Sequence, residues 1–487
     1  MKTKKITILH SNDIHGDFTS EVKEGKGKLL GGLALMSGYI NKVREEEDNV
    51  LYVISGDMVQ GSLIDAEYKG ISTMEIMNYL APDVVALGNH EFDYGLPHLL
   101  FLEKVANFPI VNANLYVKNY QKRLMKSHHA IDVDGFKILF TGIITEKIMD
   151  TLKLDPLIGS IVTLEEASSE IGKICNSHKK EDVELTVVLT HIGLESDIAL
   201  AKLLKPEWGV DMMIGGHSHS YMDKPEVVNN IIIAQAGVGS DHIGRFDLIV
   251  DEETNKIVDH TWKLLPIDED LSEPDKKLEA FIASYSNVVD KKYSTIITHF
   301  PKELTHPKRE IETSLGNLIA DIFADSYDTD VVLVGSGSIR VPSLGPEVEL
   351  KDLLACFPYD DSLSTHLITG KQLKTIFSQF MRPENRTGEG ECYQVNKGIK
   401  ATYNDKTKKL LGLEIKGEPV DDEKTYTLLI QGYHFKNSKA YLDLTTEELD
   451  ASGKSKTVTN SAQELLKEYL IDHQNLHSKV EGRLIYE

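Results

Sequence analysis

The sequence has few cysteines, no long apolar run and no excess of basic residues. Only three cysteines occur in 487 residues, Cys175, Cys356 and Cys392, and their odd number and wide spacing argue against a disulfide framework. Sparse thiols suit a reducing compartment. No apolar run approaches the ~20 residues that span a bilayer, so we expect no membrane partner. The N-terminal segment has neither an apolar core nor a small-residue cleavage site, which favours a cytoplasmic protein.

Basic residues are outnumbered by acidic ones. Lys and Arg total 53 against 76 Asp and Glu, and the net charge is −23. Nucleic-acid-binding proteins neutralise phosphates with clustered Lys and Arg, so this balance argues against a nucleic acid polymer as partner. A small phosphate substrate stays compatible with it, because bound divalent cations can supply the local positive charge.

The length predicts two domains, because a single core rarely grows beyond about 250–300 residues. Residues 1–270 alternate short β-branched apolar runs with helix-length segments, the pattern of a mostly parallel α/β sheet. Residues 271–292 follow a polar, acidic stretch and have the composition of a linker helix. Residues 293–487 mix helical and strand patterns and form the expected second domain.

Five apolar runs of the first domain end on residue types that bind metals. These residues are Asp13 and His15, Asp57, Asn89 with His90 and Asp93, His191, and His217 with His219. A sixth run, residues 230–237, ends on glycine and carries no ligand. Ligands of open α/β sheets bind outside the carboxyl ends of the strands. We therefore expect the five ends to meet at one place.

The chemistry of these residues favours two borderline metal ions. Carboxylates can bridge two ions, Asn89 offers a carbonyl oxygen, and imidazoles suit Zn, Mn, Fe or Co better than Ca or Mg alone. Phosphate chemistry at such a centre also needs an open position for a water whose pKa the metals lower. His90 can face a substrate, with Asp93 three residues on to orient its ring.

Other histidines and one glutamate near these motifs are weaker candidates. His10 is still within its strand, and Glu91 is expected to support the turn rather than to bind an ion. His128, His129 and His242 are assigned to packing or to the surface. Each metal motif alone is common in loops that bind nothing, so the prediction of a metal centre depends on their combination in one domain.

The order of these motifs resembles the 5′-nucleotidase family of calcineurin-like metallophosphoesterases, which includes UDP-sugar hydrolases and 2′,3′-cyclic-nucleotide phosphodiesterases. The first half carries DIHGDF, GDMVQGS, GNHEFDYG, NANL, THIG and GGHSH, and the second carries ETSLGNLIADI, VVLVGSGSIR and LITGKQLK. The resemblance implies a four-layer α/β/β/α metallophosphoesterase domain followed by an α+β 5′-nucleotidase-type substrate domain. It also suggests a cytoplasmic bacterial member of the family.

The resemblance further implies a role for each candidate residue. One metal would be held by Asp13, His15, Asp57 and His219, and the other by Asp57, Asn89, His191 and His217. His90 and Asp93 would stabilise the phosphoryl transition state. Substrate contacts would come from Arg340, which would grip the phosphate, and from Asn114, Tyr393 and Tyr441. The two divalent ions would be Mn²⁺ or Zn²⁺, with Co²⁺ or Fe²⁺ as alternatives.

Three segments of the second domain depart from the family pattern. A Pro-Phe-x-Asn segment is replaced by Pro-Tyr-Asp-Asp at residues 358–361. The aromatic platform before Gln-Val is replaced by Cys392 and Tyr393, and the late Gly-Gly-Asp-Gly-aromatic motif by residues 437–441. The catalytic half therefore matches the family more closely than the specificity half.

We therefore expect a binuclear-metal phosphohydrolase that releases phosphate from nucleotides, by in-line attack of a metal-activated hydroxide. The alternatives are a phosphodiesterase or pyrophosphatase acting on cyclic nucleotides, UDP-sugars or NAD, and a nucleotide sensor without catalysis. A nuclease is disfavoured by the acidic balance. The expected partner is a small phosphate ester, and the chain is expected to be a monomer or a homodimer.

Overall fold

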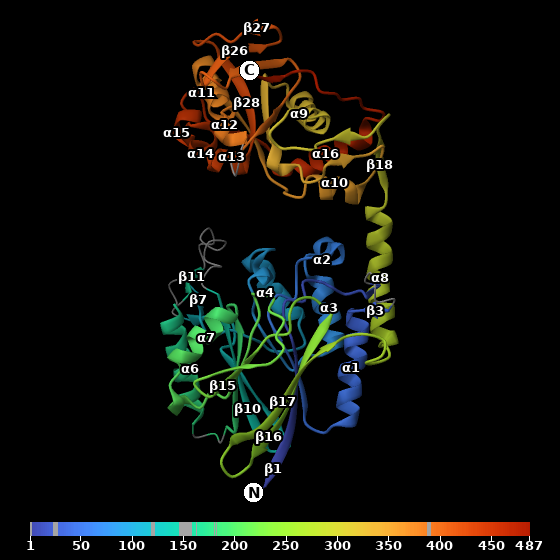
Figure 1. Ribbon diagram of the computed structural model, residues 1–487, viewed down its shortest axis with the longest axis vertical. Helices are drawn as coiled ribbons and strands as arrows, with labels where there is room; N and C mark the ends of the chain where they lie inside the picture. Colours follow the sequence, from blue (N-terminus) through green and yellow to red (C-terminus); the bar gives the residue numbers. More distant parts are fainter. Residues whose placement is uncertain are drawn as a thin grey trace. The chain divides into compact units, whose positions relative to one another are not determined.

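The computed structural model describes residues 2–22, 28–117, 122–145, 158–161, 163–179, 181, 183–386 and 391–487. The chain divides into two compact units, Met1–Val289 and Asp290–Glu487 (Figure 1). The boundary lies within helix α8 (Lys276–Tyr293), in the region where the linker helix is expected. None of the helices in the described part of the chain combines the length and the apolar character needed to cross a bilayer.

Two six-stranded mixed sheets form the centre of the first unit. The first sheet has the order β17-β16-β1-β4-β5-β6, with β1 (Thr3–Ser11), β4 (Val50–Ser55), β5 (Val84–Ala86), β6 (Ile110–Val111), β16 (His242–Asp251) and β17 (Lys256–Pro266). The second has the order β14-β15-β13-β12-β10-β9, with β9 (His128–Val133), β10 (Phe136–Ile144), β12 (Leu185–His191), β13 (Met212–Ile214), β14 (Glu226–Val228) and β15 (Ile231–Ala234). In each sheet the four strands nearest the site run parallel, and antiparallel strands lie at the edges.

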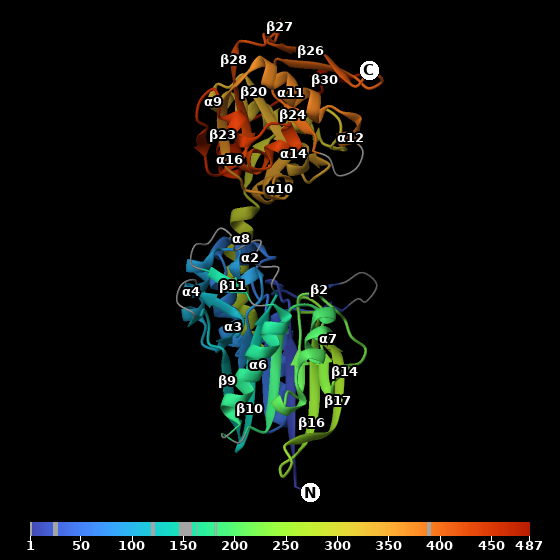
Figure 2. The same cartoon turned by 90° about the vertical axis from the view of Figure 1, so that its left-hand side faces the viewer.

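The two sheets share one apolar core, and helices cover their outer faces. Side chains of both sheets meet in this core, among them Ile8, Val53, Phe140 and Val187. Helices α1 (Leu33–Glu46), α3 (Ile71–Leu80) and α4 (Leu96–Val105) lie on the side of the first sheet, and α6 (Leu164–His178) and α7 (Leu194–Leu203) on the side of the second (Figures 1 and 2). The four-layer α/β/β/α arrangement expected for this unit is confirmed.

Local capping signals explain where several helices begin. Thr163 and Glu166 form a reciprocal capping box at the start of α6, and each satisfies a backbone N–H that the first helical turn leaves unpaired. In the second unit, Thr313 accepts a hydrogen bond from the backbone N–H of Gly316 at 3.0 Å and starts α9 (Ser314–Tyr327).

The second unit contains a five-stranded and a four-stranded sheet. The first has the order β24-β20-β28-β23-β29, with β20 (Val331–Gly335), β23 (Leu363–Thr369), β24 (Tyr393–Val395), β28 (Thr425–Gln431) and β29 (Lys456–Thr459). The second has the order β27-β26-β25-β30, with β25 (Ile399–Asn404), β26 (Lys409–Ile415), β27 (Glu418–Pro419) and β30 (Leu484–Tyr486). Helix α11 (Gly370–Phe380) joins both sheets in one core through Phe377 and Phe380.

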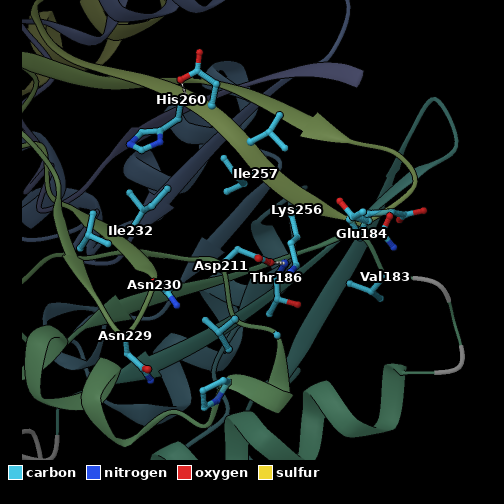
Figure 3. Close-up of a pocket in the computed structure, with 18 residues that line it drawn as sticks. Val183, Glu184, Thr186, Asp211, Asn229, Asn230, Ile232, Lys256, Ile257 and His260 are labelled. Atoms are coloured by element: carbon cyan, nitrogen blue, oxygen red, sulfur yellow. Dashed lines mark hydrogen bonds between the residues drawn. The ribbon is translucent and has the colours of Figure 1, made fainter. Parts of the chain in front are cut away.

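A pocket of about 650 Å³ lies at the amino ends of β12 and β13, opposite to the ends that carry the expected metal ligands (Figure 3). Its wall includes Thr186, Asp211, Ile232 and Lys256. The Asp211 carboxylate accepts a hydrogen bond from the backbone N–H of Thr186 at 2.9 Å. Burial raises the pKa of Asp211 to about 7, although this hydrogen bond opposes the rise. The folded unit therefore holds a carboxyl group that resists ionisation.

This raised pKa predicts that Asp211→Asn stabilises the first unit at alkaline pH. Because the folded pKa lies above the ordinary value of 3.8, the folded state binds the proton more tightly than the unfolded state does. The penalty for ionising Asp211 is absent below pH 3.8, grows between pH 4 and 7, and is constant above. We expect a gain of about 2–4 kcal/mol at pH 8 and a much smaller one at pH 5.

Thermal unfolding of both proteins at pH 5 and pH 8 measures this difference. The matched control is Asp259→Asn, which removes an exposed carboxylate from the wall of the same pocket. An equal gain at both pH values, or an equal gain in the control, would contradict the explanation by burial.

Candidate metal centre

The predicted ligands of the first unit all follow strand ends on one side of its two sheets. Asp13 and His15 lie in the loop after β1, Asp57 in the loop after β4, and Asn89 after β5. On the other sheet, His191 is the last residue of β12, and His217 and His219 follow β13. The Ser55 hydroxyl, at the end of β4, donates to the carbonyl of Ile214, at the end of β13, at 2.7 Å. The two sets of strand ends are therefore adjacent.

Left-handed backbone is concentrated in these loops. Five of the seven predicted ligands have a positive φ, between 51° and 78°: Asp13, His15, Asp57, His217 and His219. This conformation is strained for residues other than glycine, costs of the order of 1–3 kcal/mol each, and clusters at functional sites. The strain bends each loop sharply at the strand end and is retained by the packed sheets beneath.

Glycines next to these residues make room for the crowding. A Cβ atom on Gly56 would lie 2.7 Å from Nδ1 of His191 and 2.7 Å from Cα of Gly88. One on Gly216 would lie 2.9 Å from Oδ2 of Asp13. All three distances are shorter than a Cβ atom tolerates, so only glycine lets the strand ends approach this closely.

The predicted ligands converge in two adjacent groups. Asp13, His15 and His219 have ligand atoms within 4.8 Å of one another, and so have Asp57, His191 and His217. In the first group, Nε2 of His219 lies 3.3 Å from Nε2 of His15 and 3.3 Å from Oδ1 of Asp13.

In the second group, Nε2 of His191 lies 3.0 Å from Oδ2 of Asp57 and 3.1 Å from Oδ1 of Asn89. Asp57 also connects the two groups, because its Oδ2 lies 3.8 Å from Nε2 of His15. Nε2 of His191 is likewise 3.8 Å from Oδ1 of Asp13. The structure therefore brings all seven residues together around the two buried carboxylates.

Backbone carbonyls orient two of the imidazoles toward this centre. Nδ1 of His191 lies 2.8 Å from the carbonyl oxygen of Ser55, and Nδ1 of His15 lies 3.1 Å from that of Gln60. Because a carbonyl only accepts, each Nδ1 must carry the proton. Each Nε2 then faces the centre and can bind a metal ion that displaces any proton it carries, which is the usual orientation of a metal-binding histidine.

Asp57 and His191 form a buried pair of opposite charge. Burial would raise the pKa of Asp57, but His191 and the backbone N–H of His90 outweigh it and hold the pKa at about 2. Burial likewise lowers the pKa of His191, yet the carboxylates of Asp57 and Asp13 raise it to about 9. The negative potential of the two carboxylates is strong enough to hold a positive charge between them.

His90 and Asp93 lie at the edge of this centre. Nδ1 of His90 donates to Oδ2 of Asp93 at 2.7 Å, and this hydrogen bond raises the pKa of His90. One ring nitrogen of His90 lies within 4.8 Å of ligand atoms of His15 and Asp57, so the ring borders the cluster. The geometry therefore permits either the predicted catalytic contact or a metal contact.

Glu91 supports the turn that carries the bridging carboxylate. Its side chain is fully buried and accepts hydrogen bonds from the backbone N–H groups of Asp57 at 3.1 Å, Met58 at 2.7 Å and Gly88 at 2.7 Å. Burial and the Asp57 carboxylate raise the pKa of Glu91 to about 7, while these hydrogen bonds oppose the rise. Glu91 thus fixes the loops after β4 and β5 relative to each other.

Asn114, a predicted substrate contact, is buried and bonded to a neighbouring strand. Its Nδ2 donates to the carbonyl oxygen of Ile144 at 2.8 Å, and its Oδ1 accepts from the backbone N–H of Ile144 at 3.0 Å. The amide of Asn112 lies 3.2 Å from the same oxygen. The side chain ties the NANL segment to the end of β10, and its contact with substrate stays a prediction.

In the second unit, Arg340 is exposed after the short helix η4 (Ser336–Ser338). Its guanidinium donates to the Tyr359 hydroxyl at 3.0 Å and lies 5.4 Å from the centre of that ring. Tyr359 itself is 54% exposed. The departure from the family pattern at residue 359 therefore supplies a hydroxyl that holds the predicted phosphate-binding arginine.

A pocket of about 520 Å³ lies next to Tyr359. Its other lining residues include Arg309, Asp361, Glu391, Tyr433, His434 and Lys436. Tyr433 is 52% exposed, and its hydroxyl lies 3.0 Å from that of Tyr441, with the two ring centres 5.9 Å apart. The predicted aromatic contact Tyr441 is thus paired with a second tyrosine that borders the pocket.

The structure places Tyr393 differently from the prediction. Its ring is 1% exposed and packs against Phe380 and His434, with ring centres 5.2 Å and 5.0 Å apart. It belongs to the core rather than to the pocket surface, because it packs in the same apolar cluster as Phe377 and Phe380 of α11. The sequence pattern did not single out Tyr433, which borders the pocket. Its only local signal is an aromatic residue two positions after the end of β28 at Gln431.

The support by Glu91 predicts that Glu91→Gln weakens metal binding without removing a ligand. Three backbone N–H groups now donate to the two carboxylate oxygens of Glu91, and an amide would offer them only one acceptor oxygen. The loop that carries Asp57 would therefore lose its fixed position. Loss of a group that orients a ligand typically costs about 10–100-fold in metal affinity. Calorimetric titration with Mn²⁺ measures this metal affinity, and the surface change Glu103→Gln is the control. Unchanged affinity in Glu91→Gln would contradict the supporting role.

Comparison with known proteins agrees with this geometry. Residues 6–221 match the family described as Calcineurin-like phosphoesterase, and residues 295–444 match the family described as 5′-nucleotidase, C-terminal domain. The first match contains all the strand-end residues described above, and the second contains Arg340 and Tyr441.

Individual relatives match most of the length of this chain. The chain is 30% identical over 447 residues to the trifunctional nucleotide phosphoesterase protein YfkN of Bacillus subtilis, covering 82% of this chain but only 29% of that relative. It is 27% identical to a 5′-nucleotidase of Vibrio vulnificus, covering 91% and 87% of the two chains. A solved putative 5′-nucleotidase from Staphylococcus aureus has the same fold, with a TM-score of 0.67, 20% identity and coverage of 99% and 100%. The protein belongs to the calcineurin-like metallophosphoesterases that carry a 5′-nucleotidase C-terminal domain.

Proposed function

We propose that this protein is a phosphohydrolase with two divalent metal ions that releases phosphate from nucleotides. The observation that supports it most is the convergence of seven ligand-type side chains, two of which are the buried carboxylates of Asp13 and Asp57. Similarity to a nucleotide phosphoesterase and to a 5′-nucleotidase supports the choice of substrate class.

The donor set fits borderline divalent ions. Imidazoles, carboxylates and one amide oxygen suit Mn²⁺ or Zn²⁺, with Co²⁺ or Fe²⁺ as alternatives. One ion would be held by Asp13, His15, Asp57 and His219, the other by Asp57, Asn89, His191 and His217. When bound, the ions would polarise phosphoryl oxygens and acidify a water molecule.

His90 has the position and the protonation to serve the transition state. Asp93 accepts the proton of Nδ1 and favours the doubly protonated ring. In that form Nε2 carries a hydrogen that can be donated to an oxygen of the phosphoryl group or of the leaving group. The residue would thereby neutralise charge that develops during bond breaking.

The second unit would recognise the rest of the substrate. Arg340 presents an exposed guanidinium, the side chain best suited to bind two phosphate oxygens at once. Tyr433 and Tyr441 offer ring faces for a base, and Glu391 and Asp361 put carboxylates in the wall of the adjoining pocket. Such a lining favours bases with N–H donors over aryl groups without them.

Alternative substrates, the cellular location and the oligomeric state are still to be tested. Cyclic nucleotides, UDP-sugars and NAD are alternative substrates, and a sensor without catalysis is the alternative outside the enzymes. The cytoplasmic location and the monomeric or homodimeric state stay predictions.

Phosphate release by the Mn²⁺-loaded protein tests the function directly. The panel contains AMP, UMP, 2′,3′-cyclic AMP, UDP-glucose, NAD and an aryl phosphate. We expect turnover of nucleotides in preference to the aryl ester. Tyr433→Ala and Tyr441→Ala should raise KM for nucleotides and leave KM for the aryl phosphate unchanged. Turnover of none of these compounds with Mn²⁺ or Zn²⁺ would refute the proposal and favour the sensor.

His90→Ala separates catalysis from metal binding. Loss of a positioned acid typically slows turnover by about 10²–10⁴-fold, and we expect this loss with both ions retained. Asp57→Asn should instead lose metal and activity together, because it removes the bridging charge. For each variant, mass spectrometry measures the bound metal and steady-state kinetics measure kcat. Loss of metal in His90→Ala would show that His90 is a ligand.

A further inference from the structure

Two histidines outside the candidate metal centre are brought together by β9 and α6. His128 is the first residue of β9, and His178 is the last residue of α6. Successive side chains of a strand alternate between its faces, so His128 shares a face with Ala130, which packs against the cluster that contains Ile171 and Ile174 of α6. His178 lies one helical turn beyond Ile174 on the same side of α6. The fold therefore directs both rings to one point.

The ε nitrogens of the two rings face each other at short distance. Nε2 of His128 lies 2.9 Å from Nε2 of His178. The ring centres are only 4.5 Å apart and the planes are inclined by 74°. If the two rings pointed straight at each other through their Nε2 atoms, their centres would lie farther apart than 4.5 Å. The rings are therefore tilted, and the directions in which the two Nε2 atoms bind a ligand cross at a point to one side of the line between the nitrogens.

The opposite nitrogen of each ring has its own partner. Nδ1 of His178 lies 2.8 Å from Oε2 of Glu181, and Nδ1 of His128 lies 2.8 Å from the Ser127 hydroxyl. The carboxylate of Glu181 only accepts, so it keeps the proton on Nδ1 of His178 and leaves the lone pair on Nε2. The Ser127 hydroxyl can donate or accept, so His128 can hand the proton between its ring nitrogens and free its own Nε2 when a metal ion binds. His15 and His191 likewise have an acceptor at Nδ1 in the candidate metal centre, where Nε2 of His15 lies 3.3 Å from Nε2 of His219.

The surrounding charges nearly cancel. Glu181 is half exposed beside His178, whose side chain is 12% exposed. Arg123 is paired with Glu170, and Nζ of Lys126 lies 2.8 Å from Nδ1 of the neighbouring His129. Burial, His178 and Lys126 lower the pKa of His128, which favours the neutral form of its ring. A neutral imidazole is the form that binds metal.

We propose that His128 and His178 form a second metal site, which takes a borderline transition-metal cation such as Ni²⁺ or Cu²⁺, with water completing its coordination. Metal–nitrogen bonds of about 2.0–2.1 Å on nitrogens 2.9 Å apart subtend an angle of roughly 90°. That angle belongs to square-planar or octahedral coordination and is too narrow for tetrahedral zinc. The assignment of His128 to packing or surface is thereby revised.

Bound metal would join the end of α6 to the edge strand β9. Because the two ligands come from different elements, the site exists only in the folded unit, and occupancy stabilises that unit by mass action. The site is independent of the proposed hydrolysis, since none of its residues belongs to the strand-end cluster.

The test uses the full chain loaded with Mn²⁺, so that the strand-end centre is occupied. Ni²⁺ is added, and bound nickel is counted after equilibrium dialysis for the wild type, His128→Gln and His178→Gln. We expect the wild type to bind one more Ni²⁺ per chain than either variant and to show a rise in Tm with Ni²⁺ that both variants lose. Glu181→Gln should weaken this extra binding by about 10-fold or more.

His129→Gln is the matched control, because it removes the neighbouring histidine of β9 and leaves the pair intact. Phosphate release by each variant checks that the unit is folded. Equal nickel binding by the wild type and the two pair variants would overturn the proposal and leave a hydrogen-bonded histidine pair. An equal loss in His129→Gln would overturn it as well, because the binding would then be adventitious surface binding. A stronger affinity for Zn²⁺ than for Ni²⁺ would overturn the assigned geometry.

Discussion

Two buried carboxylates at the same point are the constraint on which the first unit depends. The side chains of Asp13 and Asp57 are 0% and 2% exposed. A buried negative charge is tolerated only when it is paired, hydrogen-bonded or bound to metal. Here Asp13 accepts from the backbone N–H of His217 and Asp57 from that of His90, while imidazoles surround both. Every nearby loop is shaped by the need to bring donors and cations to these two groups.

That need explains why strain is concentrated at the strand ends. Left-handed residues and tightly packed glycines would be unfavourable in an isolated loop, so the stability must come from elsewhere. The core between the two sheets supplies it, because its apolar side chains are almost completely buried. Glu91 transmits this rigidity to the site by holding three backbone N–H groups of two different loops. The polar site thus depends on an apolar scaffold for its geometry.

The sequence predicted what depends on local pattern and missed what depends on long-range packing. Apolar runs that end on Asp, Asn or His identify strand ends, and parallel topology then requires those ends to meet, so the seven residues could be found without coordinates. Tyr393 also follows a plausible pattern, but packing against Phe380 buries its ring, whereas Tyr433 is exposed. The contact between His128 and His178 joins residues 50 positions apart. No local pattern announces such a contact, since it depends on how α6 packs on its sheet.

The second unit shows how a change in a specificity segment can be absorbed by structure. Asp361 stands where the family pattern has Asn, and its carboxylate accepts from the backbone N–H of Ser362 at 2.8 Å and from that of Tyr433 at 2.6 Å. The charge-assisted hydrogen bond from Tyr433 holds the start of the helix that carries this residue, and the one from Ser362 stays within the segment of Asp361 itself. The acidic replacement therefore acts on the position of an aromatic ring before it acts on any ligand. A pocket that binds through hydrogen bonds rejects molecules that leave its buried polar groups unpaired. Both oxygens of Asp361 already accept backbone hydrogen bonds, so its first role is to position the ring of Tyr433 in the wall of the pocket.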